Sequence, residues 1–283
     1  DVEQIRKHPL ARVETNSCVV AVHSDGAGQW TVDAITQGES RRFRASRVML
    51  AAGTIASTRL ALAAMPTPPA SLRLQSNPMA AFLLCLPGAL GRPRTADFGL
   101  AQLSFALDLP ASSAFGNLFA TTGLPLSEFL PHLPVSRQAG LPLLRALMPA
   151  LVVGNVFLPG ELSNHRLRLE PDGSLHIEGG AQTTLPAALV QARSLIARSF
   201  RKIGAWMLPG SFVPGAAGAD LHYASTLPIA KHPTAFECNL SGQIDSLSGL
   251  YVVDGASLPK LPAKAHTLTI MANADRIARA IPA

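Results

Sequence analysis

The chain of 283 residues has few charged groups, few aromatic rings and few cysteines. Asp, Glu, Lys and Arg together make up 15% of the residues, whereas hydrophobic residues make up 48%. A disordered chain shows the opposite balance, so the composition excludes that class. A chain of this length supplies one large domain or two ordinary ones, with enough apolar material for a sizeable core.

Cysteine pairs and long apolar runs are also missing. The chain has three cysteines, Cys18, Cys85 and Cys238. They are far apart in the sequence and form no CxxC motif. This pattern excludes a disulfide framework, predicts no metal site and, with no signal peptide visible, favours the cytoplasm. The most apolar stretch, 141–159, contains Arg145 and Pro149. These interruptions exclude a transmembrane helix and favour a buried helix or a lid over an apolar cavity.

The basic residues do not form a nucleic-acid-binding pattern. The formal net charge is +6, from 24 Lys and Arg against 18 Asp and Glu. The densest cluster comprises Arg41, Arg42, Arg44 and Arg47. It favours a solvated strand edge over anion or nucleic-acid binding, because aromatic rings are not interleaved with the positive charges. We therefore expect no nucleic-acid partner.

Hydrophobic periodicity predicts a mixed α/β chain. Residues 12–50 predict a meander of three short strands, followed by a buried strand over 47–53 and a helix over 54–62. The middle of the chain predicts a strand over 103–109, a hairpin over 163–178 with a Pro-Asp-Gly turn, and one amphipathic helix over 185–207. The tail predicts a buried strand over 249–253 and a helix over 267–280 whose apolar face includes Ile270, Met271 and Ile277.

The tail combines a strand, an Asp-Gly turn, a loop and a helix. Asp254 and Gly255 end the strand, and α/β folds place ligands at such strand ends. The following helix start offers free N–H groups and a positive dipole end, which suit a phosphate or a developing anion. Such units also serve purely structural roles, so this feature alone leaves both interpretations open.

The amino-acid sequence of the tail resembles that of a known family. Residues 249–259 read GLYVVDGASLP, the loop 260–265 follows, and residues 266–278 read HTLTIMANADRIA. This run resembles the C-terminal signature of the glucose–methanol–choline oxidoreductases. His266 lies three residues before Thr269, where the histidine-bearing members of that family have their second catalytic residue.

A second family segment supplies the other histidine. His222 and Thr226 match its H-x-x-G-T start, whereas Ser225 replaces the glycine, and residues 227–229 differ from the family's Cys-Arg-Met. His232, which precedes a proline, is the alternative. We prefer His222 because its distance from the Asp254 strand fits the family's usual spacing.

The beginning of the chain agrees with this resemblance. Residues 46–60 read SRVMLAAGTIASTRL and resemble the family motif that closes the flavin-binding domain, with Thr58 at the usual proline position. The resemblance implies a fold of mixed α/β class: the C-terminal part of a Rossmann-like FAD-binding domain, and a substrate domain with a mostly antiparallel sheet flanked by helices. It implies that 1–66 and 216–283 belong to the FAD domain and 67–215 to the substrate domain.

The resemblance implies FAD as the cofactor, yet the strand–GxGxxG–helix cradle for its pyrophosphate is missing from the sequence. We therefore expect an N-terminal FAD-binding half elsewhere, either cleaved, removed by truncation or on a separate chain, and the absence of an initiator Met suggested the same. Within this chain, the implied flavin-binding residues are Ala52, Gly53, Asp254, Gly255, Thr267 and Leu268.

The implied activity is oxidation of an alcohol to a carbonyl, with hydride transfer to flavin N5. We assign His222 as the base and His266 as the group that positions the hydroxyl, although the two roles could be exchanged. The middle domain is rich in Leu, Phe, Ala and Pro, which favours an apolar or bulky small-molecule alcohol. The alternatives are a lyase or decarboxylase on the same scaffold, or a flavin-free binding or regulatory half.

Overall fold

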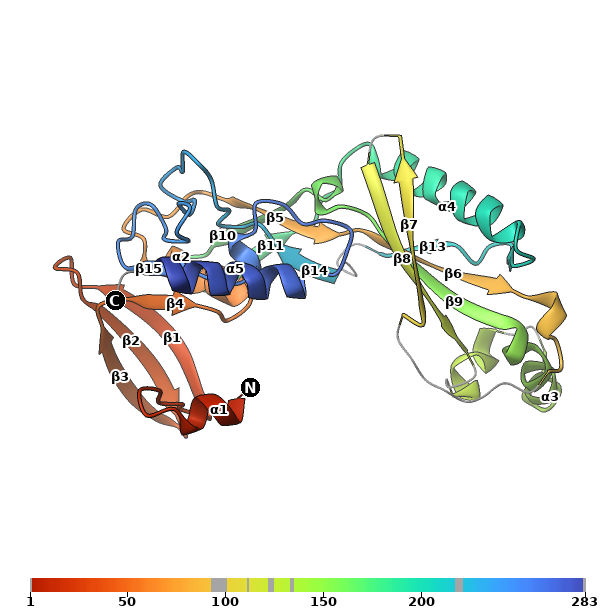
Figure 1. Ribbon diagram of the computed structural model, residues 1–283, viewed down its shortest axis with the longest axis horizontal. Helices are drawn as coiled ribbons and strands as arrows, with labels where there is room; N and C mark the ends of the chain where they lie inside the picture. The colour runs from red at the N-terminus through yellow and green to blue at the C-terminus, as the bar shows by residue number, and fades with distance from the viewer. Residues whose placement is uncertain are drawn as a thin grey trace.

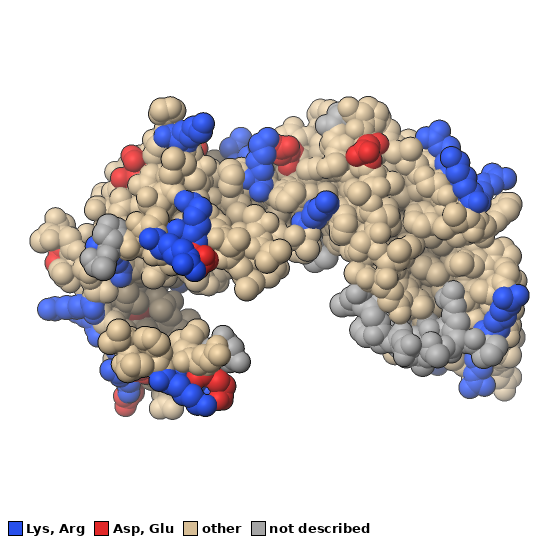
Figure 2. Space-filling model, in the orientation of Figure 1, with Lys and Arg blue, Asp and Glu red and all other residues tan. Residues whose placement is uncertain are grey.

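The computed structural model describes residues 2–92, 101–110, 112–121, 125–132, 135–216 and 221–281. They form an elongated molecule in which both chain ends lie toward one side and the largest β-sheet lies at the other (Figure 1). Figure 2 shows Lys and Arg scattered over the visible face and separated by uncharged surface.

The first sheet is the predicted meander. After α1 (Val2–Lys7), the strands β1 (Ser17–Ser24), β2 (Trp30–Thr36) and β3 (Glu39–Ala45) pair antiparallel in chain order. Trp30 is fully buried, and its Nε1 donates a hydrogen bond of 2.9 Å to the carbonyl of Ser248. This contact attaches the meander to the tail of the chain.

A parallel pair of strands links the two ends of the sequence. β4 (Val48–Leu50) pairs with β15 (Leu250–Val252), and each strand leads toward a helix, α2 (Thr54–Ala64) or α5 (Thr267–Ala280). The tail helix has the predicted bounds. The strand predicted to be buried is only partly so, because Leu50 is 5% exposed whereas Met49 is 54% exposed. The apolar face of α5 is also partly covered: Ile277 is its single buried residue, whereas Met271 is 63% exposed.

A four-stranded sheet occupies the centre. Its order is β11 (Leu175–Glu178), β10 (His165–Leu169), β5 (Leu72–Asn77) and β14 (Leu221–Ala224), all antiparallel. The predicted hairpin is confirmed by the pairing of Leu169 with Leu175, and Gly173 takes the positive φ of 81° that its turn needs.

The largest sheet is antiparallel and forms the far part of the molecule. Its order is β12 (Trp206–Met207), β6 (Met79–Cys85), β9 (Leu151–Phe157), β8 (Ser112–Ala120) and β7 (Leu103–Leu109), with β13 (Val213–Pro214) also on β6. Helix α4 (Leu185–Arg201) packs its buried residues Ala192, Ile196 and Phe200 on this sheet, and α3 (Arg137–Leu147) lies near one end (Figure 1). Short 3-10 turns lie at Pro87–Ala89, Leu126–Glu128, Leu130–His132, Met148–Ala150, Gly160–Leu162 and Gly255–Ser257.

Two predictions for the middle of the chain need correction. The helix expected over 185–207 ends at Arg201, because Gly204 adopts a φ of 80° and the chain then enters β12. The apolar stretch 141–159 is neither one buried helix nor a lid, because it contains the end of α3 and the strand β9. A proline at 149 and the valines that follow it favour this change to a strand.

The mixed α/β class and the mostly antiparallel sheet flanked by helices are confirmed. One core cluster joins the meander, α2 and the centre, and a second lies between the large sheet and α4. Strands β5 and β6 follow one another through Pro78, which carries the chain from the central sheet to the large one. Among the described residues, no helix is long and apolar enough to cross a bilayer.

Candidate active site

The structure brings His222 and His266 together. His222 lies on β14, and His266 immediately precedes the first residue of α5. Their ring centroids are 5.0 Å apart and the rings meet edge to face at 72°. Two imidazoles from distant segments therefore share one site.

The backbone around His222 is irregular. The pairing of β14 with β5 shifts register between Leu221 and Tyr223, and His222 itself has a φ of 61°. Bulges of this kind redirect a side chain out of the regular alternation and are common beside active sites. A positive φ costs a non-glycine residue of the order of 1–3 kcal/mol, so the surrounding packing must hold this conformation.

The pair is suited to remain neutral near pH 7. Burial lowers the pKa of His222, and burial together with repulsion from His222 lowers the pKa of His266. His266 is 8% exposed, and its Nδ1 has no hydrogen-bond partner in the described part of the chain. Since protonation of one ring disfavours protonation of the other, the pair takes up a second proton less readily than the first.

Aromatic side chains form the wall next to the histidines. The ring of Phe157 lies 5.5 Å from that of His222, centroid to centroid. Phe157 pairs in register with Phe115, and the Nζ of Lys264 lies 6.0 Å from the centre of the Phe115 ring. The large sheet thus presents apolar surface to the histidine pair.

Asp254 joins the ends of the two parallel strands. One carboxylate oxygen accepts hydrogen bonds from the Gly53 backbone N–H at 2.9 Å and from the Ser57 hydroxyl at 2.5 Å, and the other accepts from the Ala256 N–H at 2.9 Å. The side chain is 7% exposed. Its buried charge is therefore met by three donors, and it fixes the loop after β4 against the loop after β15.

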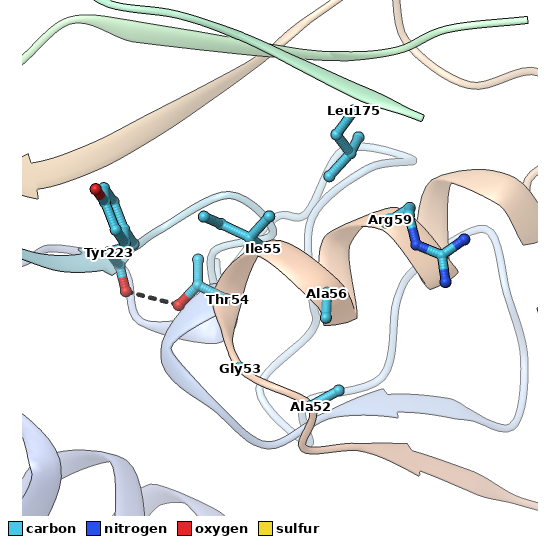
Figure 3. A pocket seen from close by; sticks show the side chains of 8 residues that line it. All are labelled: Ala52, Gly53, Thr54, Ile55, Ala56, Arg59, Leu175 and Tyr223. Atoms are coloured by element: carbon cyan, nitrogen blue, oxygen red, sulfur yellow. Dashed lines mark hydrogen bonds between the residues drawn. The ribbon is translucent and has the colours of Figure 1, made fainter. Parts of the chain in front are cut away.

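Close packing explains why a glycine, Gly255, follows Asp254. A Cβ on Gly255 would lie 2.6 Å from the hydroxyl of Thr54 and 3.0 Å from the carbonyl of Tyr223. The Thr54 hydroxyl donates a hydrogen bond of 2.6 Å to that same carbonyl (Figure 3). Gly255 thus allows the strand bearing His222 to pack against the start of α2.

A pocket of about 580 Å³ opens at the start of α2. Figure 3 shows its lining from α2 and the residues before it, together with Leu175 and with Tyr223, which lies beside Thr54. Ala52 and Gly53, both predicted to contact flavin, are part of this lining, whereas neither histidine is. The pocket and the histidine pair are adjacent through the Tyr223–His222 step of β14.

The backbone of several segments implied to bind FAD is open to a ligand. A Cβ on Gly53 would meet nothing within 4 Å, so the backbone after β4 is accessible. The side chain of His266 does not cap α5. In the first turn of this helix, Thr267 is exposed and Leu268 is 77% exposed. An accessible, uncapped helix start suits a ligand with negative charge, so these residues fit part of a flavin site. The Asp254 carboxylate is instead occupied by protein donors.

The alternative histidine lies elsewhere. His232 is exposed in the loop after β14, and the ring beside His266 is that of His222. No group of three metal-ligating side chains occurs within the described ranges.

Comparison with known proteins gives a structural likeness. No family model and no curated protein matches the sequence. Among solved structures, pyridoxine 4-oxidase from Mesorbium loti is similar, with a TM-score of 0.58 and 16% identity. The match covers 93% of this chain and 57% of that chain. The two share a fold over nearly all of this chain, as the resemblance to glucose–methanol–choline oxidoreductases implied, and this chain spans little more than half of that oxidase.

Sequence reasoning missed two residues of this region. Asn77, at the end of β5, lies 3.1 Å from the Nδ1 of His222, and Ser57 holds the Asp254 carboxylate. Asn77 precedes a proline outside every predicted element, and Ser57 lies at an ordinary position of the predicted helix over 54–62. Only the fold brings them to the site.

Proposed function

We propose that this chain is the catalytic and substrate-binding part of an FAD-dependent oxidoreductase that oxidises an alcohol to a carbonyl. The observation that carries this proposal is the edge-to-face approach of the His222 and His266 rings, whose pKa values are both lowered by burial. The shared fold with an oxidase supports it.

His222 takes the hydroxyl proton, and His266 holds the hydroxyl oxygen while negative charge develops on it. Burial favours the neutral form of both imidazoles, so a free lone pair is present at neutral pH. The apolar wall of Phe157 and Phe115 favours an apolar or bulky alcohol and limits competition from water.

Bound FAD would supply the acceptor for the hydride that leaves the carbinol carbon. Ala52, Gly53, Gly255 and the helix start at Thr267 and Leu268 would contact it through backbone atoms. Asp254 would act through the Gly53 N–H and Ser57 hydroxyl that it holds.

We also propose that the phosphate cradle for FAD comes from a further FAD-binding half. The chain lacks a GxGxxG motif, and it matches 57% of the oxidase length. Parallel sheets are normally covered on both faces, yet β4 and β15 form a parallel pair of strands with Met49 exposed. Leu268 and Met271 of α5 are exposed as well.

The visible absorbance of the tagged chain, purified from its native cells with its co-purifying material, tests the proposal. We expect a flavin spectrum that bleaches without oxygen on adding benzyl alcohol or pyridoxine, the latter chosen from the name of the similar oxidase. A preparation that holds FAD but bleaches with no alcohol of the panel would favour the lyase alternative. A preparation without flavin would favour the binding or regulatory alternative and contradict the proposal.

A further inference from the structure

Asn77 is a fully buried amide whose orientation is fixed by its neighbours. It is 0% exposed. Its Nδ2 donates to the carbonyl of Leu158 at 2.8 Å and to the carbonyl of Pro262 at 3.0 Å. Carbonyl oxygens only accept, so both amide hydrogens are used and the amide cannot flip without losing two buried hydrogen bonds.

The remaining atom of this amide faces His222. Asn77 Oδ1 lies 3.1 Å from the Nδ1 of His222. An amide oxygen cannot donate, so a hydrogen bond here requires a hydrogen on Nδ1. A neutral imidazole has one N–H, and the other nitrogen, Nε2, is then left with a free lone pair.

We propose that Asn77 is a positioning residue that holds neutral His222 in the Nδ1–H tautomer and so leaves Nε2 as the basic nitrogen. The use of Nε2 toward an alcohol rests on the proposed function, whereas the tautomer does not. An amide suits this task better than a carboxylate, because it fixes the hydrogen without adding the negative charge that would favour imidazolium.

Asn77 also connects the two histidines. Pro262 belongs to the loop that leads into His266, and the neighbouring Gln75 Oε1 accepts from the Leu261 N–H at 2.9 Å in the same loop. The end of β5 thereby holds the ring of His222 and the path of the chain to His266 together. We expect a substitution of Asn77 to release the tautomer of His222, because the hydrogen bond to its ring is lost. We also expect it to alter the path of the chain to His266, because the contact with the Pro262 carbonyl is lost.

A second histidine, His165, is expected to have the opposite tautomer and serves as an internal comparison. His165 accepts a hydrogen bond on Nδ1 from the Gly180 N–H at 3.0 Å, and its Nε2 lies 2.7 Å from the Ser76 hydroxyl. An accepting Nδ1 leaves the hydrogen on Nε2. Two buried or half-buried histidines, on the two strands that flank β5, are thus expected to show opposite tautomers.

Nitrogen NMR of the chain labelled with ¹⁵N-histidine tests the lock without any cofactor. At about pH 8, above the ordinary histidine range, we expect a protonated Nδ1 and an unprotonated Nε2 for His222, and the reverse for His165. The His222 signals are assigned by their loss in His222→Asn. An Nε2–H form, or a fast average of both tautomers, at His222 would overturn the inference.

Two variants at position 77 separate orientation from folding. Asn77→Asp retains an acceptor toward His222 and should raise the pKa of that imidazole in the NMR titration by about one unit or more. Asn77→Ala should give an averaged tautomer. An unchanged titration in Asn77→Asp with an intact His165 spectrum would contradict the contact. If His222 has the expected tautomer but no alcohol reduces the flavin, the proposed function fails and the role of Asn77 stands. If an alcohol reduces the flavin but His222 has the other tautomer, the role of Asn77 fails and the proposed function stands.

Discussion

Ser225 combines two unfavourable features at one position. Its φ is 65°, in the region that favours glycine, and its buried hydroxyl has no hydrogen-bond partner among the described residues. The segment resembling it in the oxidoreductase family has glycine at this place. The structure gives a physical reason for that preference, because a left-handed residue is needed where the Ser225 N–H donates to the carbonyl of Gly255.

We expect Ser225→Gly to stabilise the chain. Relief of the left-handed conformation is worth about 1–2 kcal/mol, and removal of the unpaired hydroxyl adds to it, against about 0.5–1 kcal/mol of added chain entropy in the unfolded state. Urea unfolding should show a net gain of about 1 kcal/mol or more. Ser225→Ala removes only the hydroxyl and should give a smaller gain. A loss of stability in Ser225→Gly would contradict this interpretation.

The lowered pKa values of His222 and His266 make the free energy of unfolding depend on pH. The folded pKa of each ring lies below its ordinary value of 6.5, so the unfolded chain binds protons first as pH falls. The free energy of unfolding should be level above about pH 6.5 and fall below it. Unfolding curves between about pH 5 and pH 8 check this, and His222→Asn with His266→Asn should flatten the slope. A slope that survives in this double variant would assign it to other groups.

At the scale of elements, the junction of the meander with β15 depends on one glycine. Gly249 has a φ of 85°, and a Cβ there would lie 2.9 Å from the Trp30 Nε1 and 3.0 Å from the Ser46 carbonyl. Trp30 is fully buried and its Nε1 is hydrogen-bonded to the adjacent Ser248 carbonyl. Neither side of this contact can move freely.

We expect Gly249→Ala to lower the free energy of unfolding by about 2–4 kcal/mol, from strain and crowding together. Gly26→Ala is the matched control, because Gly26 also has a positive φ of 76° but meets nothing within 4 Å. That control should cost about 1–2 kcal/mol. Equal losses in the two variants, measured by urea unfolding, would show that crowding against Trp30 contributes nothing.

Local patterns predicted the elements better than their surroundings. The meander, the hairpin around Pro171-Asp172-Gly173 and the extent of α5 follow from alternation, turn residues and helical periodicity, which act over a few residues. The end of α4 was placed too late, since apolar residues continue past Arg201 into β12. Periodicity alone does not separate a helix from a short strand that follows it directly.

The histidine pair could be proposed from family spacing, but its geometry could not. The register shift opposite Asn77 and the positive φ of His222 arise from packing between strands far apart in sequence. The same is true of the Ser57–Asp254 contact, which spans 197 positions. No local signal marks these partners, so Asn77 and Ser57 were found only from the fold.

At the scale of the whole molecule, one side of the chain is unusually bare. Helix α5 has 14 residues and buries one of them, although isolated helices of that length are marginal in water. Met49 on β4, and Leu268 and Met271 on α5, are exposed. The proposed FAD-binding half would cover this surface and complete the sheet beside β4 and β15.

We expect Met271→Lys to reduce the amount of FAD that co-purifies with the chain from its native cells, while the unfolding midpoint of the chain alone stays within error. The reason is that Met271 is 63% exposed within the chain and would become buried against that half. Val190→Lys on α4, at 64% exposure, is the matched control and should retain FAD. Equal FAD content in both variants would place the partner elsewhere.

The rate of flavin reduction by an alcohol in the absence of oxygen tests the central claim most directly, measured by stopped-flow absorbance in the complex that contains FAD. We expect His222→Ala and His266→Ala to retain FAD and to reduce it about 10²-fold more slowly or worse. His232→Ala, which removes the exposed alternative histidine, should match the unaltered chain. Unchanged reduction in His222→Ala and His266→Ala, or a large loss in His232→Ala, would contradict the assignment of this histidine pair as the catalytic centre.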